Sequence, residues 1–393
     1  MKSAIKNDGK KPIYLDTNLQ IIFGVSLTSV LGLSVITPAF PSIVAELNIT
    51  SQEVGLLISV FTFPGIVFNP ILGVFADRFG RKNIMVPSLM LFGFAGGASF
   101  FAADFNQLLI LRFFQGVGIA PLWPLAFTII GDIFSGKRRS AAVGYNVAVI
   151  DIGLASFPAI GGGLAMLGWH YPFLLYLVAI PVGLIVLFSL KNPEPKNKPH
   201  LKKYLSNLSR NLKNSQIAGL ITIGAFNFII FSGVFLTYFP LLIGNSFGAS
   251  PLVIGIVMTI MPAAAAFTSS QMGKLTKIYS EKNILKVAFL LYAVALVIIP
   301  FVDNLWLFLI PSVIFGVGFG LSDAGRMAFL IRLVPIIRRA TLVCADETFL
   351  VSGITLGPLI MSVIFGIWGM SAVFYAGAAF SIFLVAWTVI TLR

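Results

Sequence analysis

The chain has 393 residues, of which 58% are hydrophobic and only 10% are charged. A soluble domain carries about 25% charged residues, so this composition excludes an ordinary soluble protein and indicates a membrane protein. The net charge of +13 suits either nucleic acid or lipid headgroups, and its distribution along the chain favours headgroups. Two histidines and one cysteine provide no metal-ligand cluster and no intrachain disulfide.

Twelve apolar segments follow one another, and each is long enough to cross a bilayer as a helix, which takes roughly 20 residues. Lysine and arginine outside these segments fall at the tails and in alternate connections. By the positive-inside rule, both termini are expected in the cytoplasm of a multi-pass protein in the plasma or inner membrane. The expected spans are residues 19–45, 53–76, 84–103, 106–131, 140–165, 172–190, 217–245, 251–273, 285–302, 306–331, 340–366 and 370–392.

The predicted spans form two groups of six, joined by a polar segment rich in proline and basic residues. Several short patterns recur in the second group at an offset of 200 residues. An internal repeat of this size predicts two pseudo-equivalent helical bundles. The expected units are a cytoplasmic tail at 1–18, an N-terminal bundle at 19–190, a cytoplasmic linker at 191–216 and a C-terminal bundle at 217–393.

The connection after the second predicted span is short, basic and punctuated by glycine. Its pattern resembles the loop signature of the major facilitator superfamily, because a merely basic loop would not need this spacing of glycine and aspartate. The resemblance implies an all-α membrane protein whose twelve transmembrane helices form two pseudo-symmetric six-helix bundles around a central cavity. The matching residues are Gly73, Asp77, Arg78, Gly80, Arg81 and Lys82.

Two further patterns extend the resemblance to the twelve-helix drug:proton antiporter families. The fourth span resembles a second superfamily motif, and the fifth resembles the antiporter-associated helix-packing motif. The fifth departs from that motif at Phe157, where a glycine is expected. Small residues four apart allow neighbouring helices to approach closely. The residues of the fourth span are Arg112, Gln115, Gly116, Gly118 and Ala120, and those of the fifth are Gly144, Gly153, Pro158, Gly161 and Gly162.

Four charged residues lie inside the tenth and eleventh predicted spans, where a charge is expensive and marks a functional candidate. Arg326 and Asp346 lie at matching depths, and Asp323 is one turn from Arg326 on the same helix. We expect Arg326 to meet Asp323 and one of Asp346 or Glu347. Two roles are open for this cluster: a structural ion pair, or direct work in transport.

The N-terminal half carries Arg112 and Asp151 within its spans, and its first span contains no acid. One hypothesis is that Asp151 exchanges a proton during transport and that Arg112 favours its charged form when the two approach. The alternative is a buried, structural Asp151 that donates a hydrogen bond. Asn146 and Gln115 are candidate cavity residues in otherwise apolar surroundings, and such surroundings suit a lipophilic substrate.

These observations predict a secondary active transporter, not an enzyme, that exports lipophilic or cationic small molecules in exchange for protons. One alternative is an organic-anion symporter in which Arg112 and Arg326 bind a carboxylate. Another is a lipid flippase or a membrane sensor. No nucleotide-binding loop is present, so the proton gradient is the expected energy source and no cofactor is expected. The expected partners are the substrate and the bilayer, with no nucleic acid, and we expect a monomer.

The loop at Asp77 is predicted to act as a conformational latch. Its carboxylate would meet the positive N-terminal end of the eleventh helix near Arg339 when the cytoplasmic side closes. The resemblance implies the same latch, with Arg81 pairing with Asp132. Asp77→Asn should therefore favour the inward-open state and slow transport while substrate binding is retained. Cysteine probes on the cytoplasmic side should become more reactive, and unchanged reactivity would contradict the latch.

Overall fold

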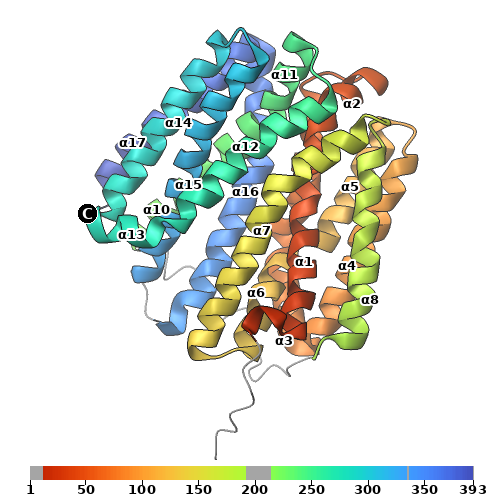
Figure 1. Ribbon diagram of the computed structural model, residues 1–393, viewed down its shortest axis with the longest axis vertical. Helices are drawn as coiled ribbons and strands as arrows, with labels where there is room; N and C mark the ends of the chain where they lie inside the picture. Colours follow the sequence, from red (N-terminus) through yellow and green to blue (C-terminus); the bar gives the residue numbers. More distant parts are fainter. Residues whose placement is uncertain (1–11, 192–213, 334–335, 393) are drawn as a thin grey trace, which may run out of the picture.

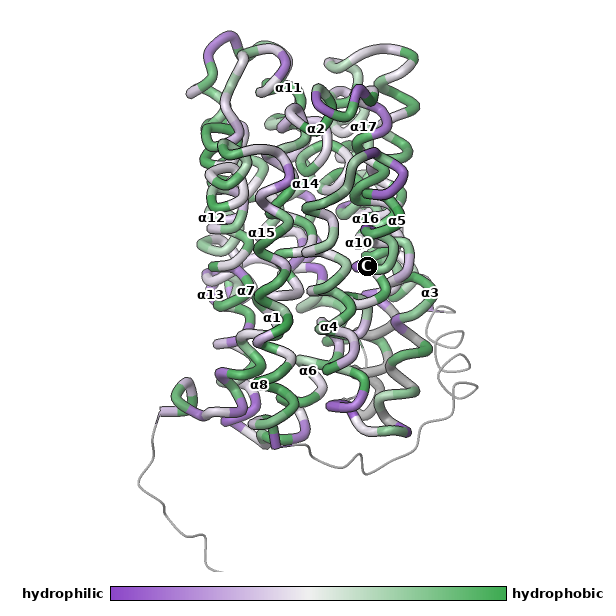
Figure 2. The backbone as a smooth tube through the Cα atoms, turned by 90° about the vertical axis from the view of Figure 1, so that its right-hand side faces the viewer, coloured by the Kyte–Doolittle hydropathy of each residue, from purple (hydrophilic) through white to green (hydrophobic). Residues whose placement is uncertain are grey.

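The computed structural model describes residues 12–191, 214–333 and 336–392, and every regular element within them is helical. Most of the predicted tail and linker lies outside the described residues. Figure 1 shows the first half, coloured red to yellow-green, beside the second half, coloured green to blue. Hydrophobic residues run along the helices, and hydrophilic residues gather towards the ends of the bundle (Figure 2).

The helices of the first half coincide with the first six predicted spans. Short 3-10 turns join several of them, and the first and fourth spans are each divided into two helices. The α-helices are α1 (Thr17–Ser34), α2 (Phe40–Glu46), α3 (Leu56–Phe79), α4 (Arg81–Ala98), α5 (Phe105–Ile119), α6 (Leu122–Ile133), α7 (Gly136–Ala165) and α8 (Ala179–Ser189).

The helices of the second half coincide with the other six predicted spans. Of the twelve spans, eleven are long and apolar enough in the described residues to cross a membrane, and the second contributes the shorter stretch Glu53–Asn69. The helices are α10 (Ser215–Ile230), α11 (Phe239–Phe247), α12 (Pro251–Ser270), α13 (Met272–Ile278), α14 (Glu281–Ile298), α15 (Leu309–Arg332), α16 (Ile336–Trp368) and α17 (Met370–Thr391).

The first helix of each half departs from α-helical geometry at overlapping positions of the repeat. In the first half, α1 ends at Ser34 and a 3-10 turn follows at Thr37–Ala39, because Pro38 cannot donate a backbone hydrogen bond. In the second half, a π-helical stretch occupies Phe231–Tyr238. The 200-residue offset of the repeat places the first stretch at 237–239, so it overlaps the end of the second stretch at Thr237 and Tyr238.

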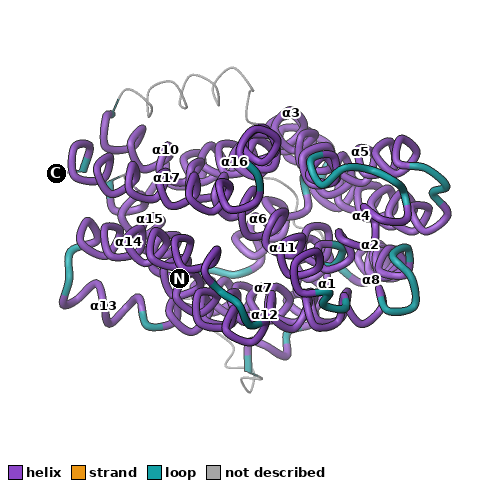
Figure 3. The backbone as a smooth tube through the Cα atoms, turned by 90° about the horizontal axis from the view of Figure 1, so that it is seen from above, coloured by secondary structure: helices purple, strands orange, loops and turns teal. Residues whose placement is uncertain are grey.

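The two halves contact each other along two helix pairs: α7 packs along α12, and α3 packs along α16 (Figure 3). The α7–α12 crossing is close because glycines bring the backbones together. A Cβ atom on Gly162 would lie 2.2 Å from the carbonyl oxygen of Pro251, and one on Gly255 would lie 2.3 Å from that of Pro158. This crossing lies far from the basic end, which we define as the end that holds Arg81, Lys191 and Lys282.

The hydrogen bonds that join the two halves also lie away from the basic end. The Ser59 hydroxyl donates to the Thr355 carbonyl at 2.7 Å, and the Thr62 and Thr355 hydroxyls lie 2.8 Å apart, so α3 and α16 are bonded between the halves. At the basic end, the described polar contacts stay within one half, as in the Lys82–Leu190 and Arg332–Glu281 contacts. The described structure is therefore joined across the halves away from the basic end.

Gly255→Leu should prevent the halves from closing at the end opposite the basic end. Its side chain would meet a carbonyl oxygen that cannot move without its helix, at a cost of about 1–3 kcal/mol to the closed arrangement. The measurement is the reactivity of a cysteine replacing buried Thr37 towards a maleimide, in a background lacking the native Cys344. We expect reactivity to rise several-fold.

The matched control is Gly163→Leu, where a Cβ atom would meet only the Leu252 side chain, at 3.8 Å. This variant should leave the Thr37 probe as unreactive as in the parent protein. Equal reactivity in the two variants would show that the close crossing at Gly255 does not control closure.

Candidate functional site

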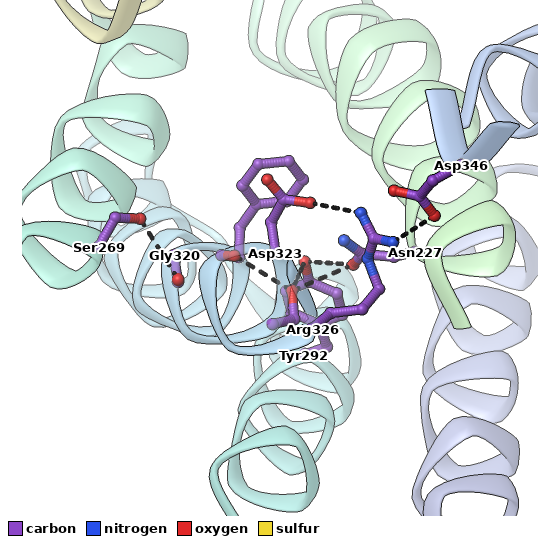
Figure 4. A network of polar contacts seen from close by, with 9 residues as sticks. Asn227, Ser269, Tyr292, Gly320, Asp323, Arg326 and Asp346 are labelled. Carbon is purple, nitrogen blue, oxygen red and sulfur yellow. Dashed lines mark hydrogen bonds and ion pairs between the residues drawn. The ribbon is translucent and has the colours of Figure 1, made fainter. Parts of the chain in front are cut away.

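The charged residues of the tenth and eleventh spans form one cluster, as the sequence predicted. Arg326 on α15 donates from Nη1 to Asp346 Oδ1 on α16 at 2.6 Å, and from Nη2 to Asp323 Oδ1 at 3.2 Å (Figure 4). Arg326 and Asp346 are fully buried, whereas the Asp323 side chain is 41% exposed. The guanidinium therefore has one buried counter-ion and one that remains accessible.

A glycine on a neighbouring helix makes room for this guanidinium. A Cβ atom on Gly224 of α10 would lie 2.9 Å from Cζ of Arg326, so no larger residue fits without displacing the charge. Asp346 Oδ2 and Arg326 Nε are buried without a hydrogen-bond partner among the described residues. The cluster therefore retains one acceptor and one donor that water or a bound group can satisfy.

A neutral hydrogen-bond network lies beside the cluster, and it was not predicted from the sequence. The Tyr292 hydroxyl donates to Asn227 Oδ1 at 2.7 Å, and the Ser322 hydroxyl donates to the same oxygen at 3.3 Å. All three residues are fully or almost fully buried. The available signal was Ser322, which directly precedes Asp323, together with two polar residues isolated in other apolar spans.

Glu347 is part of the same electrostatic group. It is partly buried, it interacts with the charges of Asp346, Asp323 and Arg326, and no hydrogen bond to it is found among the described residues. A carboxylate that lacks a hydrogen-bond partner in low dielectric is costly, so the charge of Glu347 needs compensation from its surroundings.

Asp151 lies against the other half and not against Arg112. It is half-buried on α7, and among the described groups the charge that acts on it is that of Asp323. The side of α7 that carries Asp151 is therefore turned towards the second half. The reason is that α7 packs along α12, so one face of α7 looks towards the second half.

Arg112 is fully buried and is bonded by neutral groups. It donates to the carbonyl oxygens of Leu57 at 3.2 Å and Gly32 at 3.0 Å, and to Gln115 Oε1 at 2.7 Å. Its Cζ atom also lies 4.0 Å from the centre of the Phe61 ring, a cation–π contact. Arg112 thus ties α5 to α1 and α3, and no contact joins it to Asp151 among the described residues.

The two predicted cavity residues are both packed inside the first half. Gln115 is fully buried against Arg112, and Asn146 is fully buried and accepts a hydrogen bond from the Ser26 hydroxyl at 2.9 Å. The structure therefore does not place either side chain on an open cavity surface. Both are polar groups whose hydrogen-bond partner lies on their own helix or on α1, which keeps them in the interior.

The helix-packing residues of the fifth span differ in how closely a neighbouring backbone approaches them. A Cβ atom on Gly161 would lie 1.9 Å from the Val35 carbonyl oxygen, whereas one on Gly144 would meet nothing within 4 Å. Phe157, the departure from the expected pattern, folds its ring against Gly153, where a Cβ atom would lie 3.0 Å from it. Close packing is therefore concentrated at Gly161 and Gly162, at the end where the halves meet.

The loop after α3 is described in part. Gly80 has φ +96°, a conformation that glycine adopts without strain, and Arg81 forms an ion pair with Asp132 at the foot of α6. This pair is the one that the resemblance implied. The side chains of Asp77 and Arg339, and the surroundings of Gly73, lie outside the described part of the chain, and Arg78 is exposed.

Two repeated six-helix halves with charged residues buried inside the membrane spans are typical of a secondary membrane transporter. The chain belongs to the Major Facilitator Superfamily, whose family profile matches residues 22–243 and 221–393. It is similar to Multidrug resistance protein 1 of Bacillus subtilis (strain 168), with 26% identity over 81% of this chain and 80% of that protein. It is 23% identical to the Quinolone resistance protein NorA of Staphylococcus aureus (strain COL), over 86% of this chain and 87% of that one.

A shorter match joins the chain to the Bacillibactin exporter of Bacillus subtilis (strain 168), with 34% identity over 40% of each protein. Among solved structures, a bacterial homologue of the human lysosomal transporter Spinster, inward-facing and occupied, gives a TM-score of 0.83 at 16% identity, covering 97% of each chain. A D-xylose–proton symporter gives a TM-score of 0.76 at 15% identity, over 94% of this chain and 97% of the other. These structures share the fold.

The burial difference between the two aspartates predicts unequal effects on stability. Asp346→Asn leaves a buried guanidinium without its buried counter-ion and should lower the free energy of unfolding by about 3–5 kcal/mol. Asp323→Asn removes a partly exposed partner and should cost about 1 kcal/mol or less. Denaturant titration of both variants in detergent measures this difference. Equal losses would show that Asp346 does not carry the structural role.

Proposed function

We propose that the protein exports lipophilic cations in exchange for protons. The single observation that supports this most is the surplus of acid at the site. Asp151, Asp323, Asp346 and Glu347 interact with one another or with Arg326, which is the cation shared by this group. A surplus of carboxylates in low dielectric favours binding of either protons or an organic cation.

The four acids divide into two kinds by their contacts. Asp346 is buried and holds the closer bond to Arg326, so it neutralises the guanidinium. Asp323 is partly exposed, and Asp151 and Glu347 have no hydrogen bond among the described residues. We assign substrate and proton binding to these three, and a structural role to Asp346.

An aromatic surface beside Asp323 supports the lipophilic part of the proposal. The ring of Phe319, one turn before Asp323 on α15, lies 5.7 Å from that of Phe228 and 4.9 Å from that of Phe231. All three rings are only partly buried. Rings of this kind provide flat apolar contact area and a negative face for a cation, next to a carboxylate.

Competition for the same carboxylates would couple the two fluxes. A proton and an organic cation each neutralise the acid surplus, so binding of one lowers the affinity for the other. If the empty, fully ionised site is too costly to enclose in hydrocarbon, the protein changes sides only with one of them bound. An inward proton gradient would then drive export of the cation.

The organic-anion alternative receives less support from the contacts. Arg112 is already bonded to two carbonyl groups and an amide, and Arg326 lies between two aspartates. A substrate carboxylate would have to displace these partners and enter an acidic surrounding. The arginines in the spans are therefore better explained as structural cations than as an anion site.

The test is transport of ethidium by the purified protein in liposomes with an imposed pH gradient, recorded together with proton flux. We expect wild type to couple the two fluxes, and Asp323→Asn, Glu347→Gln or Asp151→Asn to reduce uphill transport at least ten-fold. Asp303→Asn, which changes an exposed acid outside the cluster, is the matched control and should transport normally.

Each outcome assigns or removes a role. If Asp151→Asn still drives uphill transport at near-normal rates, Asp151 is not a proton carrier and the second-half acids carry the coupling. If none of the three variants alters the ratio of proton to ethidium flux, the acid surplus is structural and the proposal is wrong.

A further inference from the structure

A groove of about 300 Å³ opens between α1 and α8, away from the charge cluster. These two helices pack side by side in the first half (Figures 1 and 3). The groove begins at Thr17, the first residue of α1, and reaches Gly24, so it is about 10 Å long at 1.5 Å per residue. None of its lining residues belongs to the charge cluster or to the contacts between the halves.

The polarity of the groove changes along its length. At the end near the helix termini, the lining residues are polar: Thr17 and Gln20 on α1, and Ser189 on α8. Further into the membrane region, the walls are apolar and include Ile21 and Ile185. This gradient matches a glycerophospholipid, whose glycerol and ester oxygens need polar partners and whose acyl chain needs hydrocarbon.

The polar end of the groove is flanked by basic side chains. Lys191 follows α8 with an exposed side chain, and its backbone N–H donates to Asn18 Oδ1 at 3.1 Å. Lys82 donates from Nζ to the Leu190 carbonyl oxygen at 3.3 Å. The nearby acid, Asp16, is engaged as the N-terminal cap of α1, where its carboxylate accepts from two backbone N–H groups. The local charge therefore favours an anionic headgroup.

Glycine keeps the deep end of the groove open. A Cβ atom on Gly24 would meet Val182 at 3.6 Å, an ordinary contact, so the backbone here has room for a side chain that the sequence leaves out. A longer side chain such as leucine would extend from this Cβ position into the groove. This property makes the groove testable by a substitution that the fold accommodates.

We propose that this groove binds one anionic glycerophospholipid of the leaflet at the basic end. An acyl chain lies along the apolar walls past Gly24, and the phosphate faces Lys191 and Lys82. The bound lipid lies between α1 and α8 and is separate from the transported substrate. This assignment does not depend on the function proposed above.

The experiment is native mass spectrometry of the full-length protein in detergent with added dioleoyl-phosphatidylglycerol or dioleoyl-phosphatidylcholine. Wild type should retain one phosphatidylglycerol in preference to phosphatidylcholine. Gly24→Leu should weaken retention of phosphatidylglycerol about ten-fold, because the side chain occupies the place of the acyl chain. Lys191→Gln should weaken phosphatidylglycerol about five-fold and leave phosphatidylcholine unchanged, since one Lys near an anionic surface contributes about that factor.

Three controls separate the groove from general effects. Gly24→Ala leaves most of the groove open and should retain the lipid, and Lys191→Gln keeps the site testable where Gly24→Leu does not fold. Gly163→Leu places the same change away from the groove, and Lys274→Gln removes an exposed basic residue of the other half. Both should behave as wild type. Equal retention by wild type and folded Gly24→Leu would overturn the site, and equal retention of the two lipids by wild type would overturn its anionic preference.

Discussion

The burial of one guanidinium in the second half constrains much of the structure around it. Arg326 cannot lose its charge, so its position in a membrane helix requires partners at the same depth, and here these partners are carboxylates. One comes from its own helix and one from α16, and Gly224 on α10 leaves the space that the group fills. The ion pair of Arg326 with Asp346 thus ties α15 to α16 beside α10, and the other acids of the cluster surround a guanidinium that already has two carboxylate partners.

The first half also buries an arginine, but it compensates the charge with different groups. Arg112 is as buried as Arg326, yet carbonyl oxygens, an amide and an aromatic face compensate it in place of carboxylates. Neutral partners stabilise a charge less than a carboxylate does, but they do not change with protonation. Arg112 is therefore suited to a constant tie between helices, whereas the partners of Arg326 are carboxylates, whose charge depends on protonation.

The sequence predicted the parts of this picture that depend on position along a helix. Twelve spans, the two-half repeat and the matching depths of Arg326 and Asp346 follow from counting residues, and the structure contains all of them. The Arg81–Asp132 pair came from the resemblance of the loop. Which way each side chain points around its helix was harder to predict from the sequence, because contacts with other helices decide which side of a helix is the interior. Asp151 faces the second half, and Asn146 and Gln115 face the interior of the first. The π-helical stretch at Phe231–Tyr238 could not be predicted, because its residues are as apolar as the α-helices around it.

The two halves have therefore kept a common backbone plan and diverged in chemistry. The irregular segments at Thr37–Ala39 and Phe231–Tyr238 overlap at one end under the 200-residue offset, and glycines bring the halves together at the end away from the basic loops. The position equivalent to Asp346 is Asn146, which forms a neutral hydrogen bond with Ser26. The halves therefore share a backbone frame, whereas the buried ion pair between Arg326 and Asp346 belongs to the second half. Asp151 of the first half interacts electrostatically with Asp323 of the second, so the acidic group draws on both halves although its guanidinium comes from one of them.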